Sequence, residues 1–212
     1  MRRLVREYED VWRTRLGVDE PADVEPLRVQ PRDGAKPYRS ATRKYPEAQR
    51  DFLRRYVKEL EAIVTMQAAG LNQCTVPLAG ATPNLRAVTQ AVRGAYGFGQ
   101  FDLFKGFWQL PLASESQELF SFLTEDGVFT PTRVPQGAAD SALHFQLQMH
   151  SVFRELLYES VLFWIDDVLL FASSPADFID RLRVFFQILR QHKLKLNASM
   201  CKLFAPQARG AP

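Results

Sequence analysis

One segment of the chain reads Val161-Leu162-Phe163-Trp164-Ile165-Asp166-Asp167-Val168-Leu169-Leu170-Phe171-Ala172, with two adjacent aspartates between two short apolar runs. Short runs rich in β-branched and aromatic residues are typical of buried strands, and aspartate is common in turns. The segment therefore predicts a β-hairpin with Asp166 and Asp167 at its turn. Ionised carboxylates in an apolar setting are costly unless a cation compensates them. A bound cation is one interpretation of this pair, and two solvated turn residues are the other.

A third acid, Asp102, has a similar setting at the end of a predicted strand, between Phe101 and Leu103. Because neighbouring strand residues point to opposite faces, adjacent acids converge on one ion only where a turn breaks the alternation. Magnesium prefers oxygen ligands and keeps waters and substrate phosphates in its shell. Two or three carboxylates on adjacent strands would therefore suit a two-metal centre for phosphoryl transfer.

The rest of the chain predicts an α+β fold, an antiparallel sheet backed by helices. The apolar pattern mixes helices and strands without strict βαβα alternation. Helices are expected at 46–67, 84–93, 140–158 and 174–191, with a short helical start at 8–16. Strands are expected at 98–103, 128–134, 161–165, 168–172 and 194–196.

Composition indicates a globular protein that needs no disulfide or metal to fold. The chain has 212 residues, of which 46% are apolar and 24% charged, and a net charge of +3. Cys74 and Cys201 lack the spacing of a disulfide framework or a zinc site, so an intracellular location in the cytoplasm or nucleus is expected rather than secretion. The N-terminus has no apolar signal region, and no apolar run approaches the ~20 residues of a membrane span.

Positive charge concentrates in one stretch, residues 36–58. Eight cations and two acids give this stretch a charge of 8 − 2 = +6, and aromatic residues are interleaved with the cations. Such a stretch could neutralise nucleic-acid phosphates. A solvated helix face is the alternative. The candidate contacts to nucleic acid are Arg43, Lys44, Arg50 and Arg54.

Three motifs follow one another between Phe101 and Phe171. They read Phe101-Asp102-Leu103-Phe104-Lys105-Gly106-Phe107-Trp108-Gln109-Leu110-Pro111-Leu112, then Arg133-Val134-Pro135-Gln136-Gly137 through Phe145-Gln146, then Phe163-Trp164-Ile165-Asp166-Asp167. Together they resemble the first two palm motifs and the aromatic-x-Asp-Asp hairpin of reverse transcriptases. The resemblance is closest to the fingers and palm of gypsy-type LTR retrotransposon pol polyproteins. Three motifs in this order are far more specific than one.

The resemblance implies an RNA-directed DNA polymerase that works by two-metal nucleotidyl transfer. The implied catalytic residues are Asp102, Asp166 and Asp167, which would bind two Mg²⁺ or Mn²⁺ ions. The implied partners are an RNA or DNA template with its primer, deoxynucleoside triphosphates, and other parts of a pol polyprotein, with no membrane.

The resemblance also implies a nucleotide site. Phe107 matches the ring that excludes a 2′-hydroxyl, with an ordinary core phenylalanine as the alternative. Gln136 and Gly137 match residues that contact the incoming nucleotide. Lys193 falls in a fourth motif and would assist pyrophosphate departure, with a purely structural role equally open. Trp164 stands where the family usually has tyrosine and is a further candidate contact to nucleic acid.

Two departures from the family separate an active enzyme from an inactive relic. The basic fingers hairpin that clamps the triphosphate is expected to be deleted at the Gly70/Leu71 junction, and the sequence ends before a primer grip, thumb or ribonuclease H region. The intact acids favour catalysis, whereas these departures favour a relic that keeps the palm fold and weak nucleic-acid binding. An RNA-dependent RNA polymerase is a third, more distant interpretation, which Phe107 disfavours.

The sequence thus predicts four regions. Residues 1–40 form an N-terminal lead or linker, and residues 41–97 form partial fingers. Residues 98–204 form the palm with the three motifs, and residues 205–212 are a truncated end.

Overall fold

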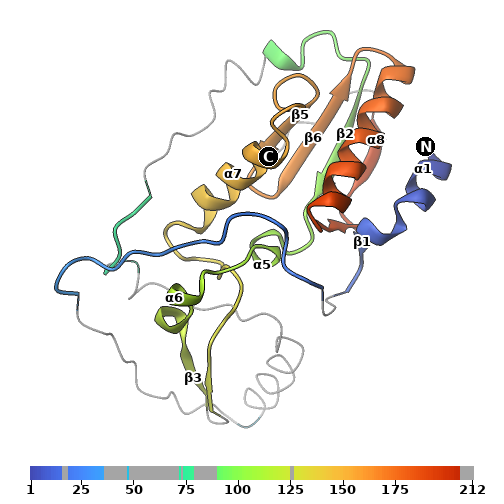
Figure 1. Cartoon of the computed structure of the whole chain (residues 1–212). Coiled ribbons are helices and arrows are strands. Elements are labelled where there is room, and N and C mark those ends of the chain that lie inside the picture. Colours follow the sequence, from blue (N-terminus) through green and yellow to red (C-terminus); the bar gives the residue numbers. More distant parts are fainter. Residues whose placement is uncertain are drawn as a thin grey trace.

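A central four-stranded antiparallel sheet organises the molecule (Figure 1). The computed structural model describes residues 1–15, 19–35, 47, 72, 74–78, 90–124 and 127–205. The sheet has the order β5-β6-β2-β8. Its strands are β5 (Val161–Trp164), β6 (Asp167–Ala172), β2 (Gly97–Asp102) and β8 (Lys202–Ala205). This arrangement confirms the predicted α+β class and the predicted hairpin, although the turn is formed by Ile165 and Asp166, and Asp167 already belongs to β6.

Smaller elements surround this sheet. The strand β1 (Trp12–Arg13) pairs in parallel with β7 (Leu196–Asn197), and β3 (Phe122–Thr124) forms a separate hairpin with β4 (Gly127–Phe129). The helices are α1 (Arg2–Glu7), α5 (Gly106–Gln109), α6 (Ser114–Gln117), α7 (Ser141–Val152) and α8 (Pro175–Gln191), with 3₁₀ turns η1 (Glu9–Val11) and η2 (Glu118–Phe120).

Helix α8 forms where the sequence predicts a helix, because its first residues carry a capping signal and its apolar residues have helical spacing. The Ser174 side chain caps the helix by accepting a hydrogen bond from the backbone N–H of Asp177, and Pro175 occupies the first helical position. Its apolar residues recur three and four positions apart and are buried against the sheet. These residues are Phe178, Leu182, Phe185, Phe186 and Leu189.

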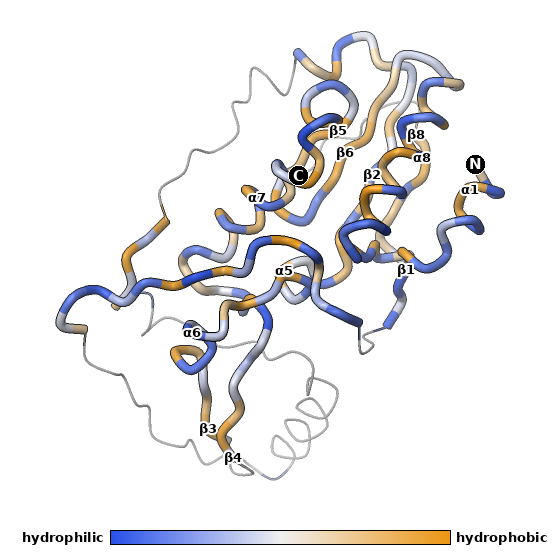
Figure 2. Tube along the Cα trace, viewed as in Figure 1, coloured by the Kyte–Doolittle hydropathy of each residue, from blue (hydrophilic) through white to orange (hydrophobic). Residues whose placement is uncertain are grey.

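The main core lies between the sheet and the helices α7 and α8 (Figure 2). The ring of Phe153, just after α7, lies 4.8 Å from the ring of Phe163 on β5 and 5.4 Å from that of Phe185 on α8. Phe101 on β2 packs 5.0 Å from Phe185. Both helices therefore cover the same face of the sheet. The opposite face carries a smaller apolar cluster that includes Phe98 and Phe171.

The N-terminal residues, predicted to form a lead or linker, pack against the main core. The Tyr8 ring lies 5.6 Å from the ring of Phe186 on α8, and Leu4, Tyr8 and Val11 are buried in the main core. These three residues follow a helical spacing of four and three, which the surrounding charged residues obscure in the sequence. The helical start lies at Arg2–Glu7 rather than at 8–16.

Residues 19–35, expected to be linker because of their prolines, run as an extended strap across the molecule. The backbone N–H of Ala22 donates to the carbonyl of Gln109 at 2.7 Å, and that of Leu27 to the carbonyl of Pro111 at 3.0 Å. Farther along, Arg32 N–H donates to the carbonyl of Cys74 at 2.8 Å. Regularly spaced prolines suit an extended chain, and the residues between them supply these donors.

Other predicted boundaries shift. The helix expected at 140–158 ends at Val152 and continues as turns, and the strand expected at 128–134 is limited to β4. The predicted helix 46–67, the Gly70/Leu71 junction and most of the predicted helix 84–93 lie outside the described residues. Among the helices that are described, none is long and apolar enough to cross a membrane.

Candidate active site

The hairpin between β5 and β6 closes through a two-residue turn. Trp164 pairs with Asp167, which leaves Ile165 and Asp166 as the turn residues. Ile165 has a φ of 55°, a left-handed backbone conformation that β-branched residues rarely adopt. Backbone strain of this kind persists only where the surroundings impose it, and it is concentrated at functional sites.

A backbone hydrogen bond joins this turn to the end of β2, next to Asp102. The backbone N–H of Leu103 donates to the carbonyl of Asp166 at 3.0 Å, and Asp102 is the register partner of Asp167. Directly opposite residues in an antiparallel pair project to the same face. The structure thus brings together all three predicted acids, two on one face of the sheet and one in the adjoining turn.

This face lies opposite α7 and α8. Side chains alternate along β2, so Asp102 projects away from the face on which Phe101 contacts α8. Trp164, paired with Asp167, shares the face of the acids, and its side chain is 60% exposed. Asp102 and Asp166 are half-buried and Asp167 is exposed beside this aromatic ring, while the helices cover the other face of the sheet.

Burial and mutual repulsion perturb the carboxylates. Burial raises the pKa of Asp102, as do the charges of Asp166 and Asp167, whereas a hydrogen bond from Asn197 opposes the shift. Burial and the charge of Asp166 likewise raise the pKa of Asp167. The thiol of Cys201 accepts a hydrogen bond from the Asp102 N–H, and burial raises its pKa to about 11. This thiol is neutral at physiological pH.

The donor set suits a hard divalent cation, because Asp102, Asp166 and Asp167 offer carboxylate oxygens whose charges repel one another, and the charge of Lys105 offsets this only at Asp102 among the groups with a resolved shift. Within the described residues, no group of three or more acidic, histidine or cysteine side chains forms a ready-made metal cage. Magnesium fits this situation, since it commonly takes one or two carboxylates and completes its shell with water and substrate phosphates.

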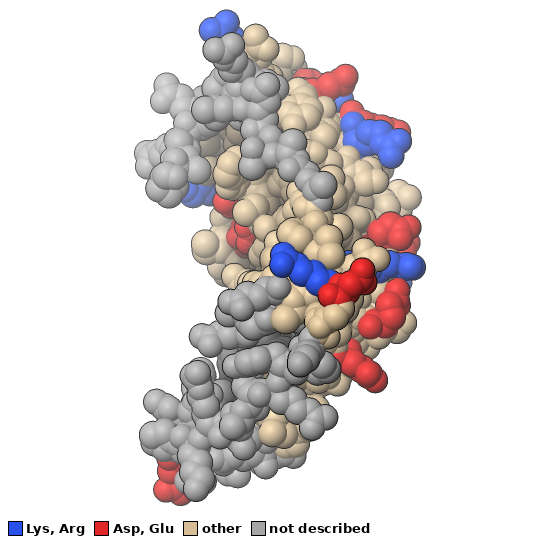
Figure 3. Space-filling view, turned by 90° about the vertical axis from the view of Figure 1, so that its left-hand side faces the viewer, with Lys and Arg blue, Asp and Glu red and all other residues tan. Residues whose placement is uncertain are grey.

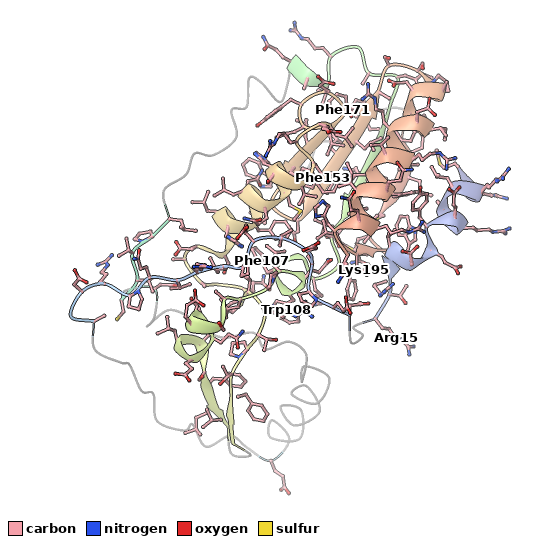
Figure 4. The ribbon with its side chains drawn as sticks, viewed as in Figure 1. Arg15, Phe107, Trp108, Phe153, Phe171 and Lys195 are labelled. Atoms are coloured by element: carbon pink, nitrogen blue, oxygen red, sulfur yellow. The ribbon has the colours of Figure 1, made fainter. Side chains whose placement is uncertain are left out.

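The predicted nucleotide residues take different positions. Phe107 on α5 is half-buried with its ring 5.4 Å from that of Phe145 on α7 (Figure 4). A Cβ added at the preceding residue, Gly106, would lie 3.0 Å from ring atoms of Phe145 and 3.2 Å from the Cβ of Asp166. A side chain at this position would fit tightly, so Gly106 lies close to both Phe145 and Asp166 and brings the adjacent Phe107 near the acids.

Gln136 and Gly137 lie in an exposed loop before α7, where Gly137 has a φ of 95° that favours glycine. Lys193 forms an ion pair with Glu20 of the strap, and the Glu20 carboxylate raises the pKa of Lys193 through hydrogen bonding. The structure thus directs the Lys193 side chain to the strap. Arg43, Lys44, Arg50 and Arg54 lie outside the described residues.

Two polar residues of the site were not singled out from the sequence as site residues. Asn72 accepts a hydrogen bond from the N–H of Ala139 at 2.9 Å and donates to the carbonyl of Gly137 at 3.0 Å, which fixes the loop that carries Gln136. Gln146 is buried on α7 and bonds to the hairpin turn. The polar and apolar residues of α7 are not sharply separated, so the sequence gives little signal that Gln146 is buried.

Comparison with known proteins identifies the family. Residues 43–209 match the family described as reverse transcriptase (RNA-dependent DNA polymerase). The chain is 28% identical over 65% of its length to the retrovirus-related Pol polyprotein from transposon 297 of Drosophila melanogaster, and 30% identical over 63% to the enzymatic polyprotein of cauliflower mosaic virus (strain D/H). It spans 13% and 20% of the lengths of these two relatives.

The fold also matches solved structures. The foamy viral protease-reverse transcriptase in complex with double-stranded DNA superposes with a TM-score of 0.74 at 15% identity, covering 96% of this chain and 47% of that one. Its complex with an RNA/DNA hybrid gives a TM-score of 0.73 at 15% identity, covering 94% of this chain and 30% of that one. The motifs, the fold and the family match agree: the chain belongs to the reverse transcriptase family.

Proposed function

We propose that this chain is the palm-containing part of an RNA-directed DNA polymerase and joins deoxynucleotides to a primer by two-metal nucleotidyl transfer. The observation that carries the proposal is the register of Asp102 opposite Asp167, on the open face of the sheet, with Asp166 in the adjoining turn. The raised pKa values of Asp102 and Asp167, caused first by burial and then by the neighbouring acids, support the proposal, because a bound cation would offset both effects.

Asp102, Asp166 and Asp167 would hold the two ions, Mg²⁺ or Mn²⁺, as divalent metals normally serve this family. When bound, such ions activate the primer 3′-hydroxyl and stabilise the charge on the departing pyrophosphate. The rigid ladder between β2 and β6 keeps the carboxylates in place. The strained turn sets Asp166 apart from the pleat alternation, so that adjacent acids can serve one site.

The incoming deoxynucleoside triphosphate would lie beside α5. Phe107, held by Phe145, would lie beneath the sugar and exclude a 2′-hydroxyl. Gln136 and Gly137 would contact the nucleotide from the loop that Asn72 fixes. A contact of Lys193 with the pyrophosphate requires its ion pair with Glu20 to open.

We propose an RNA or DNA template with its primer as the partner. The similar foamy viral protease-reverse transcriptase was solved both with an RNA/DNA hybrid and with double-stranded DNA. The exposed Trp164 ring beside the acids offers a stacking surface. On the face shown in Figure 3, acidic and basic side chains of the described residues lie close together. The residues proposed to contact the phosphates of the nucleic acid are Arg43, Lys44, Arg50 and Arg54, which lie outside the described part of the chain.

We also propose that the chain acts with other parts of a pol polyprotein and inside the cell, where its free cysteines Cys74 and Cys201 would stay reduced. The regional division at residues 40, 97 and 204 remains a proposal as well, with the strap joined to the palm by hydrogen bonds.

The test is primer extension by the purified 212-residue chain on an RNA template with Mg²⁺ or Mn²⁺. The wild type should extend the primer, and Asp166→Asn should reduce extension at least 10³-fold while template binding stays within about twofold. Asp180→Asn, an exposed acid of α8, is the matched control and should extend normally. Absence of extension by the folded wild-type chain would instead identify a non-catalytic relic.

A further inference from the structure

The side chain of Gln146 connects α7 to the strained hairpin turn. Its Oε1 accepts a hydrogen bond from the backbone N–H of Ile165 at 2.9 Å, and its Nε2 donates to the carbonyl of Phe163 at 3.1 Å. A backbone N–H can only donate and a carbonyl can only accept, so these two partners fix the orientation of the amide. One side chain therefore bonds to the backbone on both sides of Trp164.

A third contact completes the hydrogen bonding of this amide. The Nε2 of Gln146 also lies within hydrogen-bond distance of His150 Nε2, one helical turn later on α7. Because the amide nitrogen only donates, His150 Nε2 accepts, which requires the neutral imidazole with its proton on Nδ1. The His150 ring is in turn packed edge-on against Tyr158. Three hydrogen bonds thus hold the amide in one orientation, and they satisfy its polar atoms in a buried position.

One of these bonds reaches the backbone at the turn residue whose conformation is strained. Ile165 carries the left-handed backbone conformation of the turn, which an isoleucine does not adopt without external restraint. The next two residues in the chain are the acids Asp166 and Asp167. A bond from α7 to the N–H of Ile165 is therefore placed where it restrains the backbone that orients both carboxylates.

We propose that Gln146 is a positioning residue, which holds the Ile165 turn in its strained conformation and thereby sets Asp166 and Asp167 for nucleotidyl transfer. Gln146 lies on the helix side of the sheet, behind the acids, and acts through the backbone. The catalytic part of this inference rests on the proposed function, whereas the restraint of the turn does not.

The first experiment measures amide hydrogen exchange at Ile165 in the wild-type chain and in Gln146→Met. In the wild-type chain the Ile165 amide should exchange at least tenfold more slowly than an unprotected amide. Gln146→Met keeps a side chain of similar size and removes all three hydrogen bonds. It should accelerate exchange at Ile165 about tenfold or more, while exchange at Leu170 in the same sheet stays unchanged.

The matched control is Gln148→Met, two residues along α7. Gln148 also accepts a long-range backbone hydrogen bond, from the N–H of Glu25 at 3.1 Å, but does not bond to the turn. This variant should leave exchange at Ile165 unchanged. Equal exchange at Ile165 in wild type and folded Gln146→Met, or an unprotected Ile165 amide in the wild type, would overturn the proposed restraint.

Primer extension separates positioning from binding. Gln146→Met should lower kcat 10- to 100-fold and leave KM for the deoxynucleotide within about twofold, whereas Gln148→Met should change neither. Unchanged kcat despite a released Ile165 amide would refute the positioning role. If the wild-type chain extends no primer, the proposed function fails, and the exchange comparison still decides whether Gln146 restrains the turn.

Discussion

Asp102 lies directly opposite Asp167 in the ladder between β2 and β6. Like charges at directly opposed positions destabilise a sheet, and these two side chains project to the same face. The pair that would serve catalysis is therefore a cost to the folded state when no cation is bound, and this relationship leads to two predictions.

Replacing one of the acids should stabilise the cation-free protein. Asp102→Asn removes the repulsion and keeps the shape of the side chain, so Tm at pH 7 should rise by roughly 1–3 °C, since 1 kcal/mol corresponds to about 2–4 °C in a chain of this size. Extension should be abolished. Calorimetry in a chelating buffer measures the shift, with Asp180→Asn as a control that leaves Tm unchanged.

The same experiment has a pH dependence with a defined sign. The folded pKa of Asp102 lies above its unfolded value, so its contribution favours the folded state at low pH and is lost as pH rises through the folded pKa. The stabilisation by Asp102→Asn should therefore be larger at pH 8 than at pH 4. An equal shift at both values would contradict the raised pKa.

Divalent cations should stabilise the wild type through the acid site. At a free concentration about ten times Kd, binding contributes about 1.4 kcal/mol, which raises Tm by roughly 3–6 °C. Mg²⁺ or Mn²⁺ titrations followed by thermal unfolding measure this effect. In Asp166→Asn the increase should be largely lost, and a full increase in that variant would place the cation elsewhere.

Phe107 should determine sugar selection. Phe107→Ala removes the ring that packs on Phe145 and opens space where the 2′-hydroxyl would lie, so the ratio of ribonucleotide to deoxynucleotide incorporation should rise by at least tenfold. Phe129→Ala, which removes a similar ring contact with Phe122 on the β3–β4 hairpin, should leave the ratio unchanged. If an active Phe107→Ala enzyme kept the wild-type ratio of ribonucleotide to deoxynucleotide incorporation, Phe107 would have no role in excluding the 2′-hydroxyl.

Tyr8 should anchor the N-terminal residues to the palm. Its ring is buried against Phe186 and lies beneath the guanidinium of Arg190 at 4.2 Å. Tyr8→Ala should lower the free energy of unfolding by about 3 kcal/mol, as for other buried aromatic residues, and should expose residues near η1 to proteolysis. Tyr96, which is 47% exposed, supplies the control: Tyr96→Ala should cost less than about 1 kcal/mol. If Tyr8→Ala and Tyr96→Ala lowered the free energy of unfolding equally, Tyr8 would not anchor the N-terminal residues.

The site was predictable where sequence patterns are local. Apolar runs around Asp166-Asp167 specify the hairpin, and Ser174-Pro175 specifies the start of α8. The contribution of Gln146 was not predictable, because a hydrogen bond between α7 and the turn depends on how the helix packs on the sheet. The packing of Leu4, Tyr8 and Val11 in the core was not predictable either, because their apolar stripe is short and lies among charged residues. Strand β8 was also missed, since its burial alternates weakly at a sheet edge.

The strand order β5-β6-β2-β8 also bears on how the protein acquires its structure. Among the described residues, strand β2, which carries Asp102, pairs with β6 and β8, and both of these strands follow β2 by many residues in the chain. Contacts between residues far apart in sequence slow folding, because a large loop must close before they form. During synthesis, Asp102 therefore emerges well before Asp167, and the acid site can form only after β6 has been made and has paired with β2.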